Sequence, residues 1–362
     1  MKRALELAAR ALGRTCPNPV VGAVIEKDGQ IVGEGYHHQA GTPHAEVHAL
    51  NAAGENAVGA TMYVTLEPCS HYGRTPPCAD AIIKAGIKKT VIATVDPNPQ
   101  VAGQGIQKLI DAGIEVEIGV MQREAARLNE SFFKYIQTGL PLVAIKTAMT
   151  LDGKIAANSG DSKWITGETA RHYVHQLRNV YDAILVGIGT VLKDDPLLNT
   201  RLDIEGVRDP VRIIIDTNLE LPLGSNIART ANQQRTLVFC CDQADGMKRA
   251  QLESLGLEVI DITSESGLIP LERVLEILGR LGLCSLLVEG GGEINGYLLE
   301  HRLVDKLYWF IAPKIVGGRK APSPIGGQGV DYMQDVLVLK SIEMQNFAED
   351  ILITGYIKEW CI

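Results

Sequence analysis

Four residues with the chemistry of a metal site, His44, Glu46, Cys69 and Cys78, come from three separated segments of this chain. Helical periodicity begins at His44, a strand-like segment ends shortly before Cys69, and another helical stretch begins at Cys78. One imidazole and two thiolates bind a metal together only if the fold brings their segments to one point. The sequence therefore predicts two helix starts beside the end of a strand.

Zinc is the metal that fits these ligands, because thiolates beside an imidazole suit it. A catalytic zinc site has three protein ligands and an open position for water, which His44, Cys69 and Cys78 provide. Glu46 is two residues from His44, where it faces the water without ligating the metal. This pattern is typical of zinc nucleobase deaminases, in which the zinc activates a water and the glutamate carries its proton to the leaving amine.

The spacing between the two cysteines departs from that general pattern. Eight residues separate Cys69 from Cys78, whereas the usual spacing has two. A closed structural zinc site is the alternative interpretation, and it needs a fourth ligand. His71 or Cys16 is the candidate for that position.

Strand and helix signals alternate along the chain, and a helix stop divides it. The helical stretch 123–138 ends at Gly139-Leu140-Pro141, with glycine at the cap and proline beyond it. We therefore expect two domains, 1–139 and 140–362, each a three-layer α/β/α structure. Strands are expected at 20–26, 30–36, 61–66, 90–95 and 114–118, then at 142–149, 183–187, 211–216, 236–240, 257–261, 285–289 and 306–312. Residues 351–358 are expected to form an edge strand.

Charge and composition argue against several classes of partner. The chain has 35 Lys and Arg against 43 Asp and Glu, a net charge of −8, and no basic block, so nucleic acid is not expected as a partner. No apolar run approaches about 18 residues, so no membrane span is expected. Seven cysteines are too few for a disulfide scaffold and indicate a cytoplasmic setting.

Longer motifs resemble those of the bifunctional riboflavin-biosynthesis deaminase/reductase family, and the resemblance covers essentially the whole chain. They lie at 15–24, 33–37, 43–50, 67–78 and 96–99. The insert between the two cysteines, which departs from the general deaminase pattern, is typical of this family. The resemblance implies an N-terminal cytidine-deaminase-like zinc domain and a C-terminal domain similar to dihydrofolate reductase that uses NADPH.

In the first domain, the resemblance implies that His44, Cys69 and Cys78 bind zinc and that Glu46 is the catalytic proton shuttle. The residues that it implies for holding the pyrimidine and its ribose phosphate are Asn18, His37, His71, Arg74, Asp96 and Asn98. Arg74 suits a phosphate because a guanidinium offers a fork of donors. Taken singly, each of these residues also fits a solvated loop, and Asp96 and Asn98 fit turns beside prolines.

In the second domain, a buried strand opens through Gly290, Gly291 and Gly292 into a helix start, where backbone N–H groups face a phosphate. A tight turn is the alternative. The resemblance implies NADPH contacts at Ala148, Trp164, Thr166, Thr190, Asp194, Gly291, Gly292, Glu293, Ile294 and Asn295. It implies substrate contacts at Ser162, Arg178, Leu198, Arg201 and Glu289. Lys146 and Asp194 are catalytic candidates for polar steps at the sugar, and Trp164 alternatively is a packing aromatic.

Two consecutive reactions follow from the resemblance. The first is zinc-dependent hydrolytic deamination of 2,5-diamino-6-ribosylamino-4(3H)-pyrimidinone 5′-phosphate, and the second is NADPH-dependent reduction of the ribosyl chain to ribityl. A small-molecule pyrimidine ribosyl phosphate is then the partner, and a homo-oligomer is expected.

Other hypotheses are a deaminase of bases, nucleosides or nucleic acid, a zinc-stabilised binding module, and a deaminase with an inactive or structural second domain. The substitution Glu46→Ala separates catalysis from binding. It removes turnover and leaves the zinc in a catalytic site, but changes little in a binding module.

Overall fold

The structure, a computed structural model, describes residues 1–70, 76–98, 101–263 and 267–360. The chain folds as two compact units, Met1–Gly139 together with Trp360, and Leu140–Glu359. The division at Gly139 lies at the helix stop of the sequence. Trp360 belongs to the first unit, where it packs near Phe132. The sequence analysis, which assigned residues 140–362 to the second domain, does not predict that the chain comes back to the first unit at Trp360. Within the described residues, no helix has the length and apolar character needed to cross a membrane.

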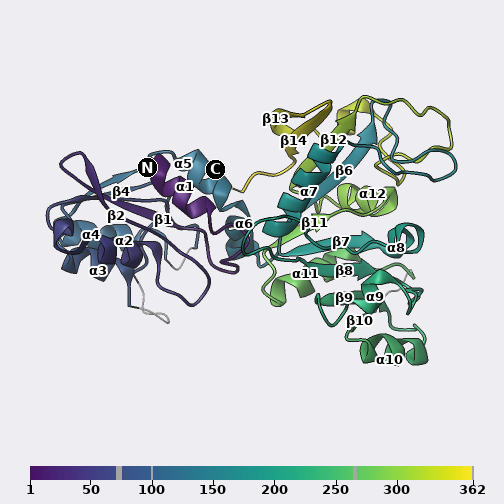
Figure 1. The fold of residues 1–362 in the computed structure, drawn as a ribbon, viewed down its shortest axis with the longest axis horizontal. Helices are drawn as coiled ribbons and strands as arrows, with labels where there is room; N and C mark the ends of the chain where they lie inside the picture. The colour runs from purple at the N-terminus through teal and green to yellow at the C-terminus, as the bar shows by residue number, and fades with distance from the viewer. Residues whose placement is uncertain (71–75, 99–100, 264–266, 361–362) are drawn as a thin grey trace. The chain divides into compact units, whose positions relative to one another are not determined.

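The first unit contains a five-stranded sheet in the order β2-β1-β3-β4-β5. Figure 1 labels β1, β2 and β4 of this sheet. β1 and β2 form an antiparallel hairpin, β1 also pairs antiparallel with β3, and β3, β4 and β5 run parallel. The strand bounds are β1 Gly22–Lys27, β2 Gln30–Tyr36, β3 Thr61–Val64, β4 Lys89–Ile92 and β5 Glu115–Ile118.

Helices cover both faces of this sheet, as the sequence predicts. One face packs against α2, α3 and α4 through Ala23, Ile25 and Met62, whereas Val24 faces α1 on the other side. α5 joins α1 on that second face. The helix bounds are α1 Lys2–Ala9, α2 Ala45–Ala53, α3 Cys78–Lys84, α4 Gln104–Asp111 and α5 Gln122–Leu128, with the 3₁₀ helix η1 at Gly54–Ala57.

The contact between α2 and β2 is unusually close because both surfaces carry small residues. Ala45 and Ala49 on α2 are fully buried. A Cβ atom added to Gly33 or Gly35 on β2 would lie 2.3 Å from the Ala49 carbonyl oxygen or 2.5 Å from that of Ala45. Only glycine allows this approach, which fixes the start of α2, where His44 is the N-cap.

The long helix expected at 123–138 is two helices, so that prediction is wrong in one respect. α5 ends at Leu128, and α6 (Glu130–Thr138) begins after Asn129. The buried amide of Asn129 accepts a hydrogen bond from the Val20 N–H at 2.8 Å and donates one to the Val20 carbonyl at 2.9 Å. Asn129 thus satisfies backbone groups of a distant segment, and the helix breaks at this residue.

The second unit contains a nine-stranded sheet in the order β10-β9-β8-β7-β11-β6-β12-β14-β13. The first seven strands in this order run parallel, and β14 and β13 are antiparallel to their neighbours. Their bounds are β6 Leu142–Thr150, β7 Ala183–Gly187, β8 Val211–Ile215, β9 Thr236–Cys241, β10 Glu258–Ile262, β11 Ser285–Val288, β12 Lys306–Ala312, β13 Lys340–Phe347 and β14 Asp350–Tyr356.

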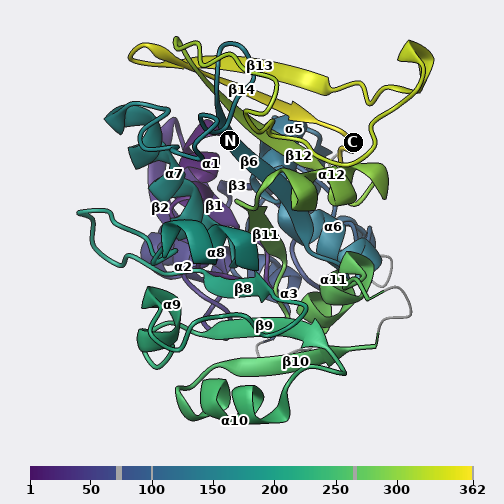
Figure 2. The same ribbon diagram turned by 90° about the vertical axis from the view of Figure 1, so that its right-hand side faces the viewer.

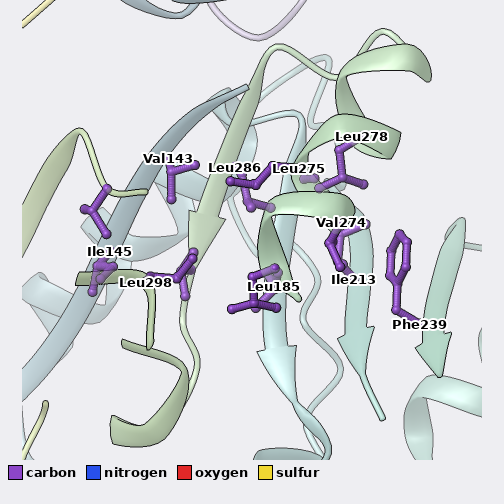
Figure 3. Packing of buried hydrophobic residues seen from close by; sticks show 14 of the residues in the cluster. Val143, Ile145, Leu185, Ile213, Phe239, Val274, Leu275, Leu278, Leu286 and Leu298 are labelled. Atoms are coloured by element: carbon purple, nitrogen blue, oxygen red, sulfur yellow. The ribbon is translucent and has the colours of Figure 1, made fainter. Parts of the chain in front are cut away.

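Helices also cover both faces of the second sheet. Leu275 and Leu278 of α11 pack over Leu185, Ile213 and Leu286 of the central strands (Figure 3). α8, α9 and α10 cover the opposite face, where α7 also packs through Tyr173 against the aromatic rings of Phe310 and Phe347. The bounds are α7 Glu168–Val180, α8 Ile188–Asp194, α9 Asn226–Arg229, α10 Gly246–Ser254, α11 Leu271–Arg280, α12 Gly292–Glu300 and the 3₁₀ helix η2 Met333–Asp335.

The predicted edge strand at 351–358 is not an edge. It corresponds to β14, which lies between β12 and β13, and β13 forms the edge (Figure 2). The sequence analysis missed β13 because all its residues except Phe347 are exposed, so a buried alternating pattern is absent from it.

Glycine at position 35 is required for the placement of α2. We expect Gly35→Ala to destabilise the first unit by about 1–3 kcal/mol, because overpacked interiors lose this much stability. Calorimetric unfolding measures this change. Gly224→Ala, whose added methyl group meets no atom within 4 Å, is the control and should change little. A Gly35→Ala protein that unfolds like wild type would contradict the close contact.

Candidate active sites

The three predicted metal ligands lie together in the first unit. His44 Nδ1 is 3.2 Å from Cys78 Sγ and 3.6 Å from Cys69 Sγ. The backbone N–H of Cys78 donates to Cys69 Sγ at 3.3 Å. His44 caps α2 and Cys78 begins α3, so two helix starts meet beside the segment that follows β3, as the sequence predicts.

The charges of this cluster suit a cation. The hydrogen bond from Cys78, with help from His44, lowers the pKa of the Cys69 thiol to about 4. The same contact with Cys69, together with burial, raises the pKa of Cys78. Without a metal, these shifts favour the thiolate form of Cys69 and the thiol form of Cys78. A zinc ion replaces the Cys78 proton favourably, because thiolates are its ligands.

The donor set fits a zinc site with an open position. The three ligand atoms all lie within 4.8 Å of one another. Among the described residues, no further His, Cys, Asp or Glu joins this group, so Cys16 is not its fourth ligand. His71, the other candidate, lies outside the described residues. Three protein donors are the number found at catalytic zinc sites.

Glu46 is buried beside this cluster, in the first turn of α2. Its side chain is only 3% exposed. Burial raises the pKa of Glu46 to about 7, and the nearby Cys69 adds to this effect while His44 opposes it. A carboxyl group with this pKa takes up and releases a proton near neutral pH, which is the property that general acid–base catalysis requires.

A cavity of ≈ 470 Å³ opens onto Glu46 and the ligands His44 and Cys69. The predicted substrate residues in its lining are Asn18, His37, Asp96 and Asn98. His71 and Arg74 lie outside the described residues, so their predicted contacts stay predictions.

His37 is held in one orientation within that wall. Its Nδ1 lies 3.2 Å from the Pro43 carbonyl and its Nε2 lies 3.2 Å from the Asn18 amide nitrogen. Burial lowers the pKa of His37, so the neutral ring donates from Nδ1 to Pro43 and accepts from Asn18. The Asn18 amide is thereby oriented at the cavity wall.

Several further residues of this cavity received no role from the sequence, among them Glu67, Phe132 and Ile136. Phe132 and Ile136 belong to α6, which the sequence gave only as a long helix. Glu67 stands inside the metal motif, and its presence beside Cys69 is the signal that could have drawn attention to it.

In the second unit, a partly buried ion cluster joins three of the predicted residues. Arg178 donates from Nε and Nη2 to the two carboxylate oxygens of Glu289 at 2.7 and 3.0 Å. Lys146 Nζ lies 3.4 Å from Glu289 Oε2. Burial alone would raise the pKa of Glu289, but the charges of Arg178 and Lys146 lower it to about 2. The carboxylate therefore stays ionised and holds Lys146 of β6 and Arg178 of α7 beside the carboxyl end of β11.

These residues line a cavity of ≈ 1010 Å³. Its lining also includes the predicted residues Ala148, Ser162, Trp164, Thr166, Thr190, Asp194, Arg201, Gly291, Gly292, Glu293 and Ile294. Trp164 is 62% exposed, so the alternative of a packing aromatic is wrong. The guanidinium of Arg171 lies over its ring at 4.7 Å.

The glycine segment places a helix start in this cavity. α12 begins at Gly292, and both Gly291 and Gly292 line the cavity wall. The N–H groups of a first helical turn have no intrahelical partner and favour an anion. A Cβ on Gly292 would lie 2.8 Å from the Ser323 carbonyl oxygen, so glycine is needed there for close packing. These features fit a phosphate-bearing cofactor.

Two predicted residues lie away from the cavity surface. Leu198 is 3% exposed and packs in the core with Val191 and Ile214, so its side chain is not placed for the predicted substrate contact. Asn295 is 1% exposed, and its amide donates to the Pro324 carbonyl at 2.8 Å. Its side chain secures a neighbouring segment and does not line the predicted cofactor site. Both side chains have apolar or backbone partners that the sequence does not reveal, and the predicted contacts of the two residues stay predictions.

Basic and imidazole side chains that the sequence analysis missed also line this cavity: Arg171, His175, Lys193, Arg319 and Lys320. Burial and the charges of Arg178 and Arg201 lower the pKa of His175 to about 4, so its ring is neutral near pH 7. The Arg201 N–H donates to His175 Nδ1 at 3.2 Å. The spacing of Arg171, His175 and Arg178 on one helical face was the available signal.

Comparisons with known proteins match both units. Residues 1–94 match the cytidine and deoxycytidylate deaminase zinc-binding region, and residues 141–353 match the RibD C-terminal domain. The first match confirms the predicted deaminase-like zinc domain.

The whole chain also has curated relatives. It is 47% identical over 353 residues to the riboflavin biosynthesis protein RibD of Actinobacillus pleuropneumoniae, which covers 98% of this chain and 93% of the relative. The corresponding protein of Aquifex aeolicus is 46% identical over 353 residues, 98% of this chain and 96% of that relative.

Solved structures of similar proteins have the same fold. Acinetobacter baumannii RibD, form 1, has a TM-score of 0.87 at 42% identity, covering 98% of this chain and 97% of that one. A diaminohydroxyphosphoribosylaminopyrimidine deaminase/5-amino-6-(5-phosphoribosylamino)uracil reductase from Thermotoga maritima has a TM-score of 0.86 at 40% identity, with 98% and 97% covered.

We expect Glu46→Gln to lower the rate of amine hydrolysis about 10²–10⁴-fold, because the amide cannot carry the proton. Zinc content, measured by atomic absorption, should stay at the wild-type value. Glu124→Gln, at an exposed position of α5, is the control. Turnover of Glu46→Gln close to that of wild type would show that another group moves the proton.

Glu289 should make the second unit sensitive to acid. Its folded pKa of about 2 lies below the value of about 4.3 for an unfolded glutamate, so its contribution to stability is complete above about pH 4.3. That contribution is lost as the pH falls from about 4.3 towards 2. We expect the melting temperature of Glu289→Gln to depend less on pH over this window than that of wild type. Glu253→Gln, which alters an exposed carboxylate, should keep the wild-type dependence; equal slopes in all three proteins would contradict the ion cluster.

Proposed function

The chain belongs to the RibD family of riboflavin biosynthesis proteins, and we propose that it catalyses both the deamination and the reduction named for its relatives. One observation carries the proposal. The ligand atoms of His44, Cys69 and Cys78 lie within 4.8 Å of one another, and the buried Glu46 lies beside them. The second unit adds a separate cavity with the partly buried Lys146–Glu289–Arg178 cluster.

The first reaction is hydrolysis of the 2-amino group of 2,5-diamino-6-ribosylamino-4(3H)-pyrimidinone 5′-phosphate. Water adds to the ring carbon that bears the amine, the carbon–nitrogen bond breaks, and ammonia leaves. Bound at His44, Cys69 and Cys78, zinc would supply a Lewis acid that lowers the pKa of water towards about 7. Glu46 takes the proton from the water and returns it to the departing nitrogen, a role that its pKa of about 7 supports.

The walls of the first cavity orient the pyrimidine for this step. The Asn18 amide, fixed by His37, offers hydrogen bonds to the base. Asp96 and Asn98 line the same cavity and are proposed to hold the base and its ribose phosphate.

The second reaction reduces the ring-opened ribosyl chain to ribityl in the second unit. NADPH would supply the hydride when bound along the α12 helix start and Thr190. Lys146 Nζ is proposed to donate the proton that the sugar oxygen needs, and Asp194 borders the same cavity. Arg178 and Arg201 are proposed to attract the substrate phosphate by their positive charge, although Nε and Nη2 of Arg178 are themselves bound to Glu289.

A structural or silent second unit is the competing hypothesis. A merely structural unit has no need for three ionised side chains at a cavity wall, because apolar residues of similar volume would stabilise the fold as well. The ion cluster of Lys146, Arg178 and Glu289 therefore favours an active reductase. We also infer from the family a cytoplasmic homo-oligomer.

The test uses purified, zinc-loaded protein with the diamino-ribosylamino-pyrimidinone phosphate, with and without NADPH. We expect ammonia in both samples, and NADPH oxidation only after deamination. Ammonia without NADPH oxidation would contradict the second activity. Absence of ammonia would contradict the first.

A further inference from the structure

Glu67 is a buried carboxylate that the proposed chemistry does not use. It follows β3, and its side chain is 4% exposed. Its Oε2 accepts hydrogen bonds from the N–H groups of Asp96 at 3.2 Å and Gly103 at 3.0 Å. Its Oε1 accepts from Gly105 at 2.9 Å and Ile106 at 3.2 Å. One side chain thus binds the backbone after β4 and the first turn of α4.

These four bonds decide what Glu67 can do. A carboxylate has about four lone-pair sites, and all of them are used here. Although Glu67 borders the cavity, it has no acceptor site left for a proton of the substrate or of water. A role as a second general base is therefore not available to it.

A close backbone contact reinforces the same connection. A Cβ added to Gly105 would lie 1.9 Å from the Pro68 carbonyl oxygen. The start of α4 therefore packs directly on the residue between Glu67 and the metal ligand Cys69. The Glu67 N–H also donates to the Thr94 carbonyl at 2.9 Å.

The backbone that Glu67 holds carries the cavity residues Asp96 and Asn98. Asp96 is bound directly through its N–H, and the Asn98 N–H donates to Asp96 Oδ1 at 2.9 Å. Val101, which precedes the Gly103 contact, lines the same cavity. Displacement of Glu67 would therefore move one wall of the site relative to the metal ligands.

We propose that Glu67 is a positioning residue that fixes the Asp96–Asn98 segment against the metal-binding segment and so sets the affinity for the pyrimidine substrate. This inference rests on the proposed deaminase function. A cap of α4 with no effect on the substrate is the competing role, and it predicts a change in stability alone.

The variant Glu67→Gln tests this role because it keeps the shape and replaces one acceptor oxygen by an NH₂ donor. That donor faces two backbone N–H groups, so one pair of hydrogen bonds is lost whichever way the amide turns. We expect KM, and the dissociation constant measured by calorimetry, to rise about 10- to 100-fold, because the segment that carries Asp96 and Asn98 loses hydrogen bonds to a charged group. The maximal rate should change much less.

Control measurements separate a change in substrate affinity from a general loss of folded structure. Zinc content should stay at the wild-type value, and reduction of the deaminated substrate in the second unit should be unchanged. Glu55→Gln, at an exposed position of η1, should behave as wild type. Loss of zinc in Glu67→Gln, or an unchanged KM and dissociation constant with only a lower melting temperature, would overturn the proposal.

A double variant shows whether Glu67 acts through the substrate segment. If it does, Glu67→Gln combined with Asn98→Ala should raise KM no more than the larger single effect, because coupled residues are not additive. Full additivity would overturn the proposal. Wild-type protein that binds the pyrimidine phosphate but releases no ammonia would contradict the proposed function, whereas the calorimetric comparison would still test Glu67.

Discussion

Each unit buries a glutamate just beyond a central strand, and an ionised carboxylate in such a place is stable only if donors surround it. Glu67 meets this requirement with four backbone N–H groups, and Glu289 meets it with Arg178 and Lys146. Because these donors cannot move without leaving the charge unsatisfied, each carboxylate fixes the wall of its own cavity. The positions of the proposed substrate residues follow from this constraint in both units.

Glu46 is buried as well, but there the effect of burial outweighs the contacts with His44 and Cys78 that lower its pKa. Burial raises the pKa of Glu46 to about 7. The cations around Glu289, in contrast, lower the pKa of Glu289 to about 2. The first carboxyl group therefore exchanges a proton near neutral pH, and the second acts as a permanent charge. Glu46 is thus proposed to transfer a proton, whereas Glu67 and Glu289 are proposed to position the residues around them.

Residues with a distinctive chemistry could be assigned from the sequence, and those defined by packing could not. His44, Cys69 and Cys78 lie together as predicted. Their residue types and their order along the chain were enough to identify them as a group of metal ligands. The buried positions of the Leu198 and Asn295 side chains could not be predicted because their surroundings come from distant segments. The break at Asn129 likewise depends on the backbone of Val20, more than a hundred residues away, and β13 is exposed along nearly its whole length.

The central claim is that two separable sites act in succession on one pyrimidine phosphate. Mixing Glu46→Gln protein with Lys146→Met protein tests it, because each chain then retains one working site. With the diamino substrate, zinc and NADPH, the account predicts no ribityl product from either variant alone, and product from the mixture after a lag. A mixture that forms no ribityl product would contradict it.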